Sequence, residues 1–433
     1  MGRVFFFRVM ALPVTVLLQT WVLWKDKGKA AALLTSAAEM WKAQGIRQVC
    51  AAAYSVAEGR IRTVFFRLWG SRHRDGSLHI AFCPTGGLGD YIISARLLEE
   101  IRTICPMKVT VFCEKPTYGK AVYGMGEDVR VSGYENFERE RWGCDLALYV
   151  EHFVHIKNAD RKRLKMLSPE LYRRVHLIRR HWKRLYVETG EQCYRERVQF
   201  ERCRTLGLNR WTELRMGGAF QMADQKVRIP MQESYGAMWN RRGMGSKRYI
   251  TVNYGTDRMR RRGRQVKLWP KTYYERLIRE CRKDIPGSAF IQIGDAQAER
   301  IAGADLYLLG ENLELIKWVL RGAFCHIDCE GGLVHLATQL GTKCIVVFGP
   351  TPVHMYAYPQ NRNLQSGQCQ NCMGLHKDWA YHCFRGEEEA ACMRAVTWDM
   401  VFRELRRLVA ADDPEDKGKA QEDETVSPGY MEI

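Results

Sequence analysis

Two patterns of apolar residues alternate along most of the chain. Short apolar runs such as "HIAFC" (79–83), "KVTVFC" (108–113) and "DLALYVEHF" (145–153) are typical of buried strands. Between them, stretches such as "YIISARLLEEI" (91–101) carry apolar residues at the i, i+3, i+4 spacing of an amphipathic helix. This alternation of strand and helix predicts βαβ units in a parallel, doubly wound sheet.

A second series of strands and helices begins near residue 248. It contains the strand patterns "RYITVNYG" (248–255), "SAFIQIG" (288–294), "FCHID" (324–328) and "KCIVVFG" (343–349), with helical patterns between them. Because 433 residues exceed one ordinary core, we predict two α/β domains, over residues 78–237 and 238–409. Ligands of open α/β sheets bind beyond the carboxyl ends of the strands, so two facing domains would enclose a cleft.

The two ends of the chain differ from these domains in composition. Residues 1–77 are predicted to form a helical extension, whose apolar part, 9–24, contains Pro13 and Gln19 and is shorter than the ~20 residues of a membrane span. This favours a membrane-surface anchor or a docking helix, although Arg3 and Arg8 also resemble the positive flank of a signal anchor. Residues 410–433 are acidic and low in apolar residues, which predicts disorder.

The net charge of +18 indicates an anionic partner, which nucleic acid, a membrane surface or a phosphorylated substrate would provide. The most basic stretch, residues 157–186, contains a predicted helix that begins near Ser168. This stretch is either a solvated face or a surface for an anionic acceptor or lipid headgroups. We expect no nucleic-acid partner, because no recognised nucleic-acid module accompanies the basic residues.

Three glycines and an aspartate, Gly86, Gly87, Gly89 and Asp90, lie in the turn between the first predicted strand and helix. Glycine there leaves the backbone accessible, and the helix start offers free N–H groups to an oxyanion. The spacing does not match the dinucleotide fingerprint G-x-G-x-x-G. Asp90 is suited to act as a general base, and the alternative is a simple glycine turn whose aspartate caps the helix.

In the second predicted domain, glycine follows a predicted strand at two places. Gly255 follows a strand and precedes a basic loop that is suited to phosphate, with residues Arg258, Arg260, Arg261, Arg262, Arg264 and Lys267. Further on, Glu330, Gly331 and Gly332 lead into a helix that carries His335. His335 could equally be a core histidine, and Glu330 could serve only the helix dipole.

Acidic residues also follow the strand 288–294. Asp295 and Glu299 lie where a donor ribose would bind, but an acidic residue after a strand is common.

These motifs together resemble the heptosyltransferase family, glycosyltransferase family nine. The segments that carry the resemblance are "GGLGD", "KLWPKTYYERL", "IQIGDAQAER", "GGLVHLATQLG" and "VVFGPT", in the family's order and spacing. The resemblance implies the GT-B fold, in which two Rossmann-like domains face each other. It also implies an inverting, metal-independent transfer of a heptose from ADP-heptose to a lipopolysaccharide core sugar.

The resemblance also implies roles for single residues. Asp90 matches the catalytic base, and Lys267 matches the lysine that contacts the sugar-phosphate of the donor. The donor site would further include Gly255, Glu330, Gly331, Gly332 and His335, and the acceptor would bind at Gly86, Gly87 and Gly89. The family usually has Asp followed by Ser or Thr where this chain has Glu330 and Gly331. Because that acidic residue holds the sugar hydroxyls, the departure leaves the identity of the transferred sugar open.

Four cysteines lie close together near the end of the second domain, at Cys369, Cys372, Cys383 and Cys392. In a cytosolic protein, a C-x₂-C pair with two more thiols favours a tetrathiolate metal site over disulfides. The irregular spacing leaves zinc, iron or unligated thiols open. Similar loops occur in the resembled family, where some members are said to carry iron. Such a metal would be structural, and catalysis is expected to require no cofactor.

The sequence therefore predicts a cytoplasmic glycosyltransferase at the inner face of a membrane, which uses an ADP-sugar and an anionic glycan or lipid-linked acceptor. One alternative is an enzyme that transfers heptose to serine or threonine of a surface protein. Another is an inactive scaffold that binds polyanions or membranes.

Overall fold

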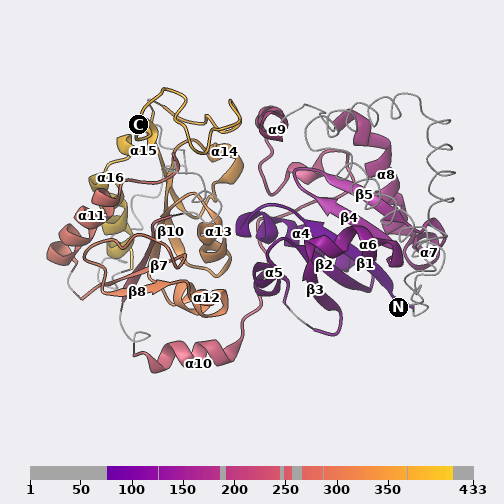
Figure 1. Cartoon of the computed structure of the whole chain (residues 1–433), viewed down its shortest axis with the longest axis horizontal. Helices are drawn as coiled ribbons and strands as arrows, with labels where there is room; N and C mark the ends of the chain where they lie inside the picture. The colour runs from indigo at the N-terminus through magenta and orange to yellow at the C-terminus, as the bar shows by residue number, and fades with distance from the viewer. Residues whose placement is uncertain are drawn as a thin grey trace, which may run out of the picture.

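The computed structural model describes residues 76–412, except for residues 125, 186–191, 244–247, 256–265, 286 and 368. Two α/β domains lie side by side in it (Figure 1). The predicted N-terminal extension up to residue 75, the arginines of the basic loop and the acidic tail beyond residue 412 lie outside the described residues.

The first domain is built on a five-stranded sheet of order β3-β2-β1-β4-β5. Its strands are β1 (Leu78–Pro84), β2 (Met107–Cys113), β3 (Val129–Gly133), β4 (Leu146–Val150) and β5 (Val154–Ala159). Its helices are α4 (Leu88–Ile104), α5 (Pro116–Tyr123), α6 (Phe137–Glu140), α7 (Arg161–Leu167), α8 (Pro169–Leu185) and α9 (Gln192–Leu206). Short 3₁₀ turns are η1 (Tyr134–Asn136), η2 (Arg141–Gly143) and η3 (Glu213–Arg215).

The edge of this sheet differs from the sequence prediction. The pattern at residues 145–153 predicts one strand, but the strand ends at Val150 and the chain reverses within three residues. Strand β5 then runs back along β4 in antiparallel register, because so short a connection cannot cross over to a parallel position.

The second domain is built on a six-stranded parallel sheet of order β11-β10-β9-β6-β7-β8. Its strands are β6 (Tyr249–Asn253), β7 (Ala289–Gly294), β8 (Leu306–Leu309), β9 (Cys325–Cys329), β10 (Lys343–Phe348) and β11 (Arg362–Gln365). Its helices are α11 (Lys271–Asp284), α12 (Leu313–Arg321), α13 (Gly332–Gln339), α14 (Val353–Tyr356), α15 (Ala391–Ala395) and α16 (Trp398–Ala410). The two parallel-sheet domains confirm the predicted α/β class.

Each sheet reverses its strand order at one point, between β1 and β4 in the first domain and between β6 and β9 in the second. The central strands are buried on both faces, as parallel sheets covered by helices require. Chain segments that leave β1, β6 and β9 therefore diverge at these points and leave a crevice at the carboxyl ends of the strands.

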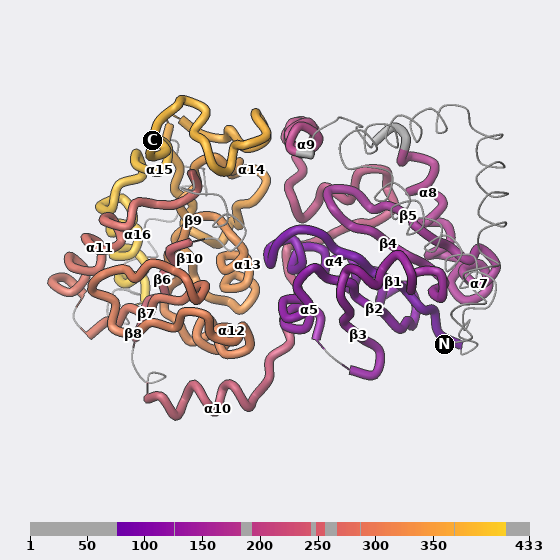
Figure 2. The backbone as a smooth tube through the Cα atoms, in the orientation of Figure 1, coloured from indigo at the N-terminus to yellow at the C-terminus, as the bar shows by residue number. Residues whose placement is uncertain are grey.

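Helix α10 (Glu233–Arg241) follows the long segment that leads from the first domain to the second, and it packs against α12 (Figure 2). A Cβ atom on Gly236 would lie 2.8 Å from the indole ring of Trp318, so glycine is what allows this helix to lie so close to α12.

The two domains meet mainly where the starts of α4 and α13 pack against each other. A Cβ atom on Gly89 would lie 2.5 Å from the His335 ring, and one on Gly332 would lie 2.9 Å from Cβ of Leu88. Both glycines therefore allow a close helix contact that any larger residue would force apart.

A buried lysine makes a second link between the domains. Lys317 of α12 is fully buried, and its ammonium group donates to the carbonyl oxygens of Ala121 (3.0 Å) and Pro230 and pairs with Glu314 at 2.9 Å. Ala121 belongs to α5 of the first domain, and Pro230 belongs to the connecting segment. Burial lowers the pKa of this lysine, and Glu314 offsets part of that effect.

Candidate functional site

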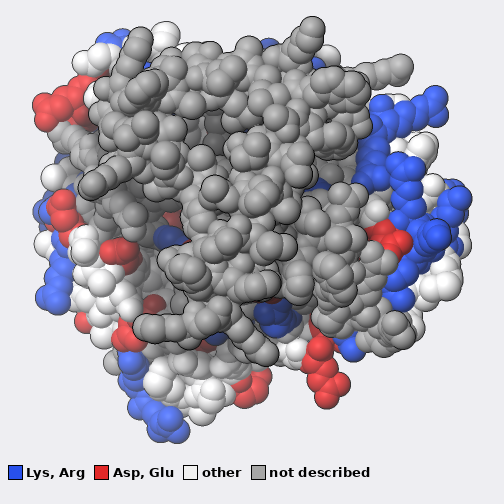
Figure 3. All heavy atoms as spheres, turned by 45° about the vertical axis from the view of Figure 1, so that its right-hand side comes forward, with Lys and Arg blue, Asp and Glu red and all other residues white. Residues whose placement is uncertain are grey.

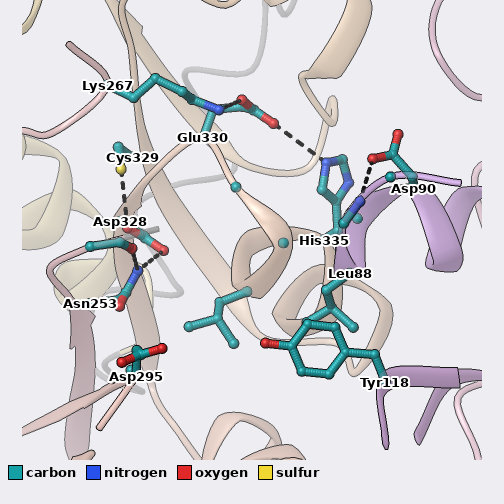
Figure 4. A pocket seen from close by; sticks show the side chains of 18 of the residues that line it. Leu88, Asp90, Tyr118, Asn253, Lys267, Asp295, Asp328, Cys329, Glu330 and His335 are labelled. Carbon is teal, nitrogen blue, oxygen red and sulfur yellow. Dashed lines mark hydrogen bonds and ion pairs between the residues drawn. The ribbon is translucent and has the colours of Figure 1, made fainter. Parts of the chain in front are cut away.

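A cleft of about 560 Å³ lies between the two domains at the carboxyl ends of β1, β6, β7 and β9 (Figure 4). Its lining includes all the residues that the family resemblance assigns to catalysis, donor binding and acceptor binding. These residues are Gly86, Gly87, Gly89 and Asp90 from the first domain and Gly255, Lys267, Glu330, Gly331, Gly332 and His335 from the second. The structure thus brings together motifs that are up to 249 residues apart in the sequence.

Asp90 lies in the first turn of α4, and its carboxylate is about one third exposed to the cleft. One oxygen, Oδ2, accepts a hydrogen bond from the backbone N–H of Gly87 at 2.9 Å. The preceding glycine makes this possible: Gly86 has φ +101°, and a Cβ atom there would lie only 2.1 Å from the Asp90 carboxylate. The first glycine of the turn therefore makes room for the aspartate.

The other carboxylate oxygen of Asp90, Oδ1, accepts a hydrogen bond from the guanidinium of Arg210 at 3.0 Å. Burial alone would raise the pKa of Asp90, but the charge of Arg210 and the Gly87 N–H outweigh it, and the pKa is lowered. The carboxylate is therefore ionised at neutral pH and can accept a proton from a group in the cleft.

Charged and polar groups also line the opposite wall of the cleft. Lys267 Nζ lies 2.6 Å from Glu330 Oε2, and the other Glu330 oxygen lies 3.6 Å from His335 Nε2. His335 Nδ1 lies 2.6 Å from the hydroxyl of Tyr358, which fixes the ring while its carbon edge packs on Gly89. His335 thus combines a core position with a place in the cleft wall.

The Lys267–Glu330 ion pair is nearly buried, and this decides the charge state of both groups. Burial would raise the pKa of Glu330, yet Lys267 and His335 lower it to about 2. Burial likewise disfavours the charged form of Lys267, but Glu330 reverses this and raises the lysine pKa. Both side chains therefore stay charged, and the lysine can share its charge with an anionic ligand.

The glycines that face the cleft differ in the space around them. A Cβ atom on Gly87 would have no neighbouring atom within 4 Å, and Gly331 is extended, with its nearest neighbour 3.7 Å from an added Cβ. The space beside Gly89 and Gly332, in contrast, is filled by residues of the other domain. A ligand would therefore approach the backbone at Gly87 and Gly331.

Several cleft residues were missed by the sequence analysis. Asn253 at the end of β6 donates to Asp328 Oδ2 at 3.0 Å and to the carbonyl oxygen of Gly255 at 2.9 Å, and both side chains line the cleft. Their position at the strand ends beside the reversal of strand order was a signal that could have identified them. Asp295 also lines the cleft, whereas Glu299 lies outside it and pairs with Lys271 at 2.9 Å.

Arg210 was missed for another reason. It is 120 residues from Asp90, and nothing in the sequence around it resembles a motif.

The four cysteines of the predicted metal site lie around a separate, smaller cavity, next to Val266. The loop that carries them reaches the cleft through Met373 and Trp379, and Ala380 accepts a hydrogen bond from the N–H of Val266, beside Lys267. Among the described residues, no group of three or more His, Cys, Asp or Glu side chains is arranged to hold a metal ion. Burial and the neighbouring thiols raise the pKa of Cys372 to about 11 and that of Cys392 to about 12.

No protein-family model matches the sequence, and no curated protein matches it. Among solved structures, the chain is similar to ADP-heptose LPS heptosyltransferase II of E. coli, with 15% identity over 77% of this chain and 98% of that chain and a TM-score of 0.47. It is also similar to a family 9 glycosyl transferase from Veillonella parvula, with 12% identity over 78% of this chain and 99% of that chain and a TM-score of 0.47. A third similar structure is an iron-containing dodecameric glycosyltransferase from enterotoxigenic E. coli, with 14% identity over 77% of this chain and 78% of that chain and a TM-score of 0.49.

The Lys267–Glu330 pair predicts a pH dependence of stability. Because the folded state lowers the pKa of Glu330 to about 2, this group favours folding above the ordinary glutamate pKa, and the contribution is lost as pH falls toward about 2. We expect Glu330→Gln to flatten the pH dependence of the unfolding free energy between about pH 4.5 and 2, by up to about 1.4 kcal/mol per pH unit. Urea unfolding across this range measures the slope. The control is Glu299→Gln, whose ion pair is exposed; an equal effect of both variants would contradict the prediction.

Proposed function

We propose that the chain is an inverting glycosyltransferase that transfers a heptose from ADP-heptose to a lipopolysaccharide core sugar. The observation that supports this most is the pairing of the two cleft walls. One wall presents the ionised carboxylate of Asp90, and the other presents Lys267 and the glycine turn at the start of α13. A proton acceptor that faces a cation and a helix N-terminus suits a hydroxyl acceptor and a nucleoside diphosphate leaving group.

The first wall would activate the acceptor. A sugar hydroxyl is a weak nucleophile, so its proton must leave as its oxygen forms the new bond to C1 of the donor sugar. Asp90 takes that proton, and its Gly87 and Arg210 hydrogen bonds leave lone pairs free to do so. Such general-base assistance contributes about 10²–10⁴ in rate.

The second wall would stabilise the leaving group. As the bond between C1 and the β-phosphate oxygen breaks, its electron pair and negative charge pass to the departing ADP. Lys267, already charged, and the free N–H groups at the start of α13 can bind that charge. The ion pair with Glu330 holds the lysine side chain in place before a diphosphate arrives.

The donor sugar would lie between these walls, near Glu330, Asp328 and Gly331. Gly331 has no side chain and its backbone is extended, so the space beside it is open to the sugar. Glu330 turns toward Lys267, which leaves sugar hydroxyls to share its oxygens. That the sugar is a heptose follows from the sequence resemblance. A protein serine or threonine as acceptor is the alternative, and acceptor screening distinguishes the two.

We further propose that the enzyme works at the inner face of a membrane. Six exposed cations of α7 and α8 support this: Arg161, Lys162, Lys165, Arg173, Arg179 and Arg180. Met166 is 67% exposed beside them, and Lys and Arg side chains gather along the right-hand edge of Figure 3. Such a surface attracts anionic lipid headgroups. Within the described residues, the structure contains no helix with the length and apolar character of a membrane span.

A structural zinc or iron at the four cysteines stays a prediction. In support, all four side chains line one cavity, although their arrangement is not that of a closed metal site. Catalysis as described above does not pass through this cavity, and elemental analysis of the purified protein tests for the metal.

Nucleotide binding tests the donor assignment. Isothermal titration calorimetry with ADP, UDP and GDP at physiological salt should show selective binding of ADP. Loss of a charge-assisted contact predicts that Lys267→Ala weakens ADP binding by about 10- to 100-fold. The control Lys271→Ala removes an exposed lysine outside the cleft and should have no effect. Preference for UDP or GDP would contradict the ADP-sugar assignment, and binding of none would favour the scaffold alternative.

Substitution of Asp90 tests the base. Asp90→Asn should lower the rate of ADP release from ADP-heptose, with a heptose-deficient lipopolysaccharide core as acceptor, by about 10²–10⁴. Affinity for ADP should stay within about threefold, because Asp90 lies on the acceptor wall. The control Asp224→Asn removes an exposed carboxylate that pairs with Arg96. Wild-type turnover in the Asp90 variant would rule out the base assignment.

Charge reversal on α8 tests the membrane surface. Arg179→Glu with Arg180→Glu should weaken co-sedimentation of the full chain with vesicles that contain anionic lipid, and binding should fall as salt rises. The matched control reverses Arg403 and Arg406 on α16, so the net charge is identical. Equal binding by the two double variants would contradict a role for α8.

A further inference from the structure

A buried arginine links the candidate base to the interior of the first domain. Only 3% of the surface of Arg210 is exposed to solvent. Its guanidinium binds two carboxylates at once: Nη2 donates to Asp90 Oδ1 at 3.0 Å, and Nη1 forms a very short contact with Oε1 of Glu213. Of these two carboxylates, only that of Asp90 lines the cleft.

The chain of charged groups continues behind Arg210. Both oxygens of the buried Glu213 carboxylate lie close to His152 Nδ1, at 3.1 and 3.0 Å, and Gln199 Nε2 lies 3.4 Å from one of them. Glu213 therefore has two partners on its far side and keeps Arg210 oriented. The order from the cleft inward is Asp90, Arg210, Glu213 and His152.

The backbone of Arg210 is held by the second domain. Its N–H donates to the carbonyl oxygen of Met355 at 2.9 Å, and Met355 belongs to α14. The next residue of that helix, Tyr356, lines the cleft. The segment around Arg210 is itself rigid, because the side chain of Asn209 accepts hydrogen bonds from the N–H groups of Trp211 and Thr212.

We propose that Arg210 is a positioning residue that aims the Asp90 carboxylate into the cleft, and that its bond to α14 makes this alignment depend on contact between the two domains. The proposal rests on the function proposed above, since it concerns the same base. Arginine suits this task because its planar fork can bind two carboxylates in fixed directions, whereas a lysine ammonium is a point charge on a flexible stem.

The charges around Asp90 affect both its protonation state and its strength as a base. The positive charge of Arg210 keeps Asp90 ionised, which weakens it as a base, while Glu213 behind the arginine moderates that charge. Burial lowers the pKa of His152, but Glu213 outweighs it and the pKa is raised. The charged or titratable groups that face this chain from neighbouring elements include Glu151, Glu196, Cys203 and Tyr356.

A pH–rate profile tests the proposal. The probe is ADP-heptose with the acceptor used for Asp90, and ADP release is followed. For Arg210→Gln we expect kcat to fall more than tenfold, ADP affinity to stay within about threefold, and the acid limb of kcat/KM to move up by about one to three pH units. Arg210→Lys should keep the acid limb near its wild-type position but lower kcat, because the charge remains and the fork is lost. A profile identical to wild type in Arg210→Gln would overturn the proposal.

Two further variants keep the test independent of misfolding. Arg210→Gln leaves Glu213 buried without its cation, so a second variant combines Arg210→Gln with Glu213→Gln and removes both charges. Its acid limb should still move up, but by less than in Arg210→Gln alone, because the negative charge of Glu213 is also gone. Arg215→Gln is the control, because Arg215 lies five residues further along the chain, at the end of η3, and its side chain donates to the backbone carbonyls of residues 221 and 222. A merely structural role would lower the amount of active enzyme without moving the limb.

A measurement without substrate separates this proposal from the proposed function. If wild-type protein releases no ADP from ADP-heptose, the proposed function fails. The interaction between Asp90 and Arg210 is then tested by thermal unfolding of Asp90→Asn, Arg210→Gln and the double variant. Coupled residues predict a midpoint shift in the double variant that differs from the sum of the single shifts by at least about 2 °C. Additive shifts would overturn the link between Arg210 and Asp90 whatever the reaction is.

Discussion

The close contact between the starts of α4 and α13 is the constraint on which the cleft depends. Gly89 lies against the His335 ring, and Gly332 lies against Leu88, so the two glycine turns are in direct contact. Because each helix begins at the carboxyl end of a central strand, this single contact places the ends of β1 and β9 opposite each other. Asp90 and Glu330 then face one space from two domains without any segment having to reach across.

Within that space, charge is arranged before any ligand is present. Asp90 is held by Arg210 and Gly87, and Lys267 is held by Glu330, so each reactive group already has its partner. Buried ion pairs contribute little net stability, because desolvation offsets their attraction. Their value here lies in geometry: the side chains do not have to reorganise when a substrate binds.

The sequence predicted the parts of this arrangement that are local. The strands, the glycine turns and Lys267 follow from patterns within about twenty residues, and the fold class follows from their order. The antiparallel strand β5 and the four-residue edge strands β8 and β11 were missed, because short, half-buried strands show almost no regular pattern of apolar residues. Gly89 was predicted to bind a ligand, whereas the structure shows that it also contacts His335. Arg210 could not be found, since its partner Asp90 is distant in the chain.

Lys317 has a consequence for how the cleft works. Its ammonium group is held by carbonyls from α5 and from the connecting segment, and by Glu314 of its own helix. Rotating the domains apart would pull this buried charge away from the carbonyl oxygen of Ala121, while the ion pair with Glu314 on the same helix would be kept. Opening of the hinge therefore has to break a hydrogen bond to a buried charge, which ties the width of the cleft to the packing of α5 against α12.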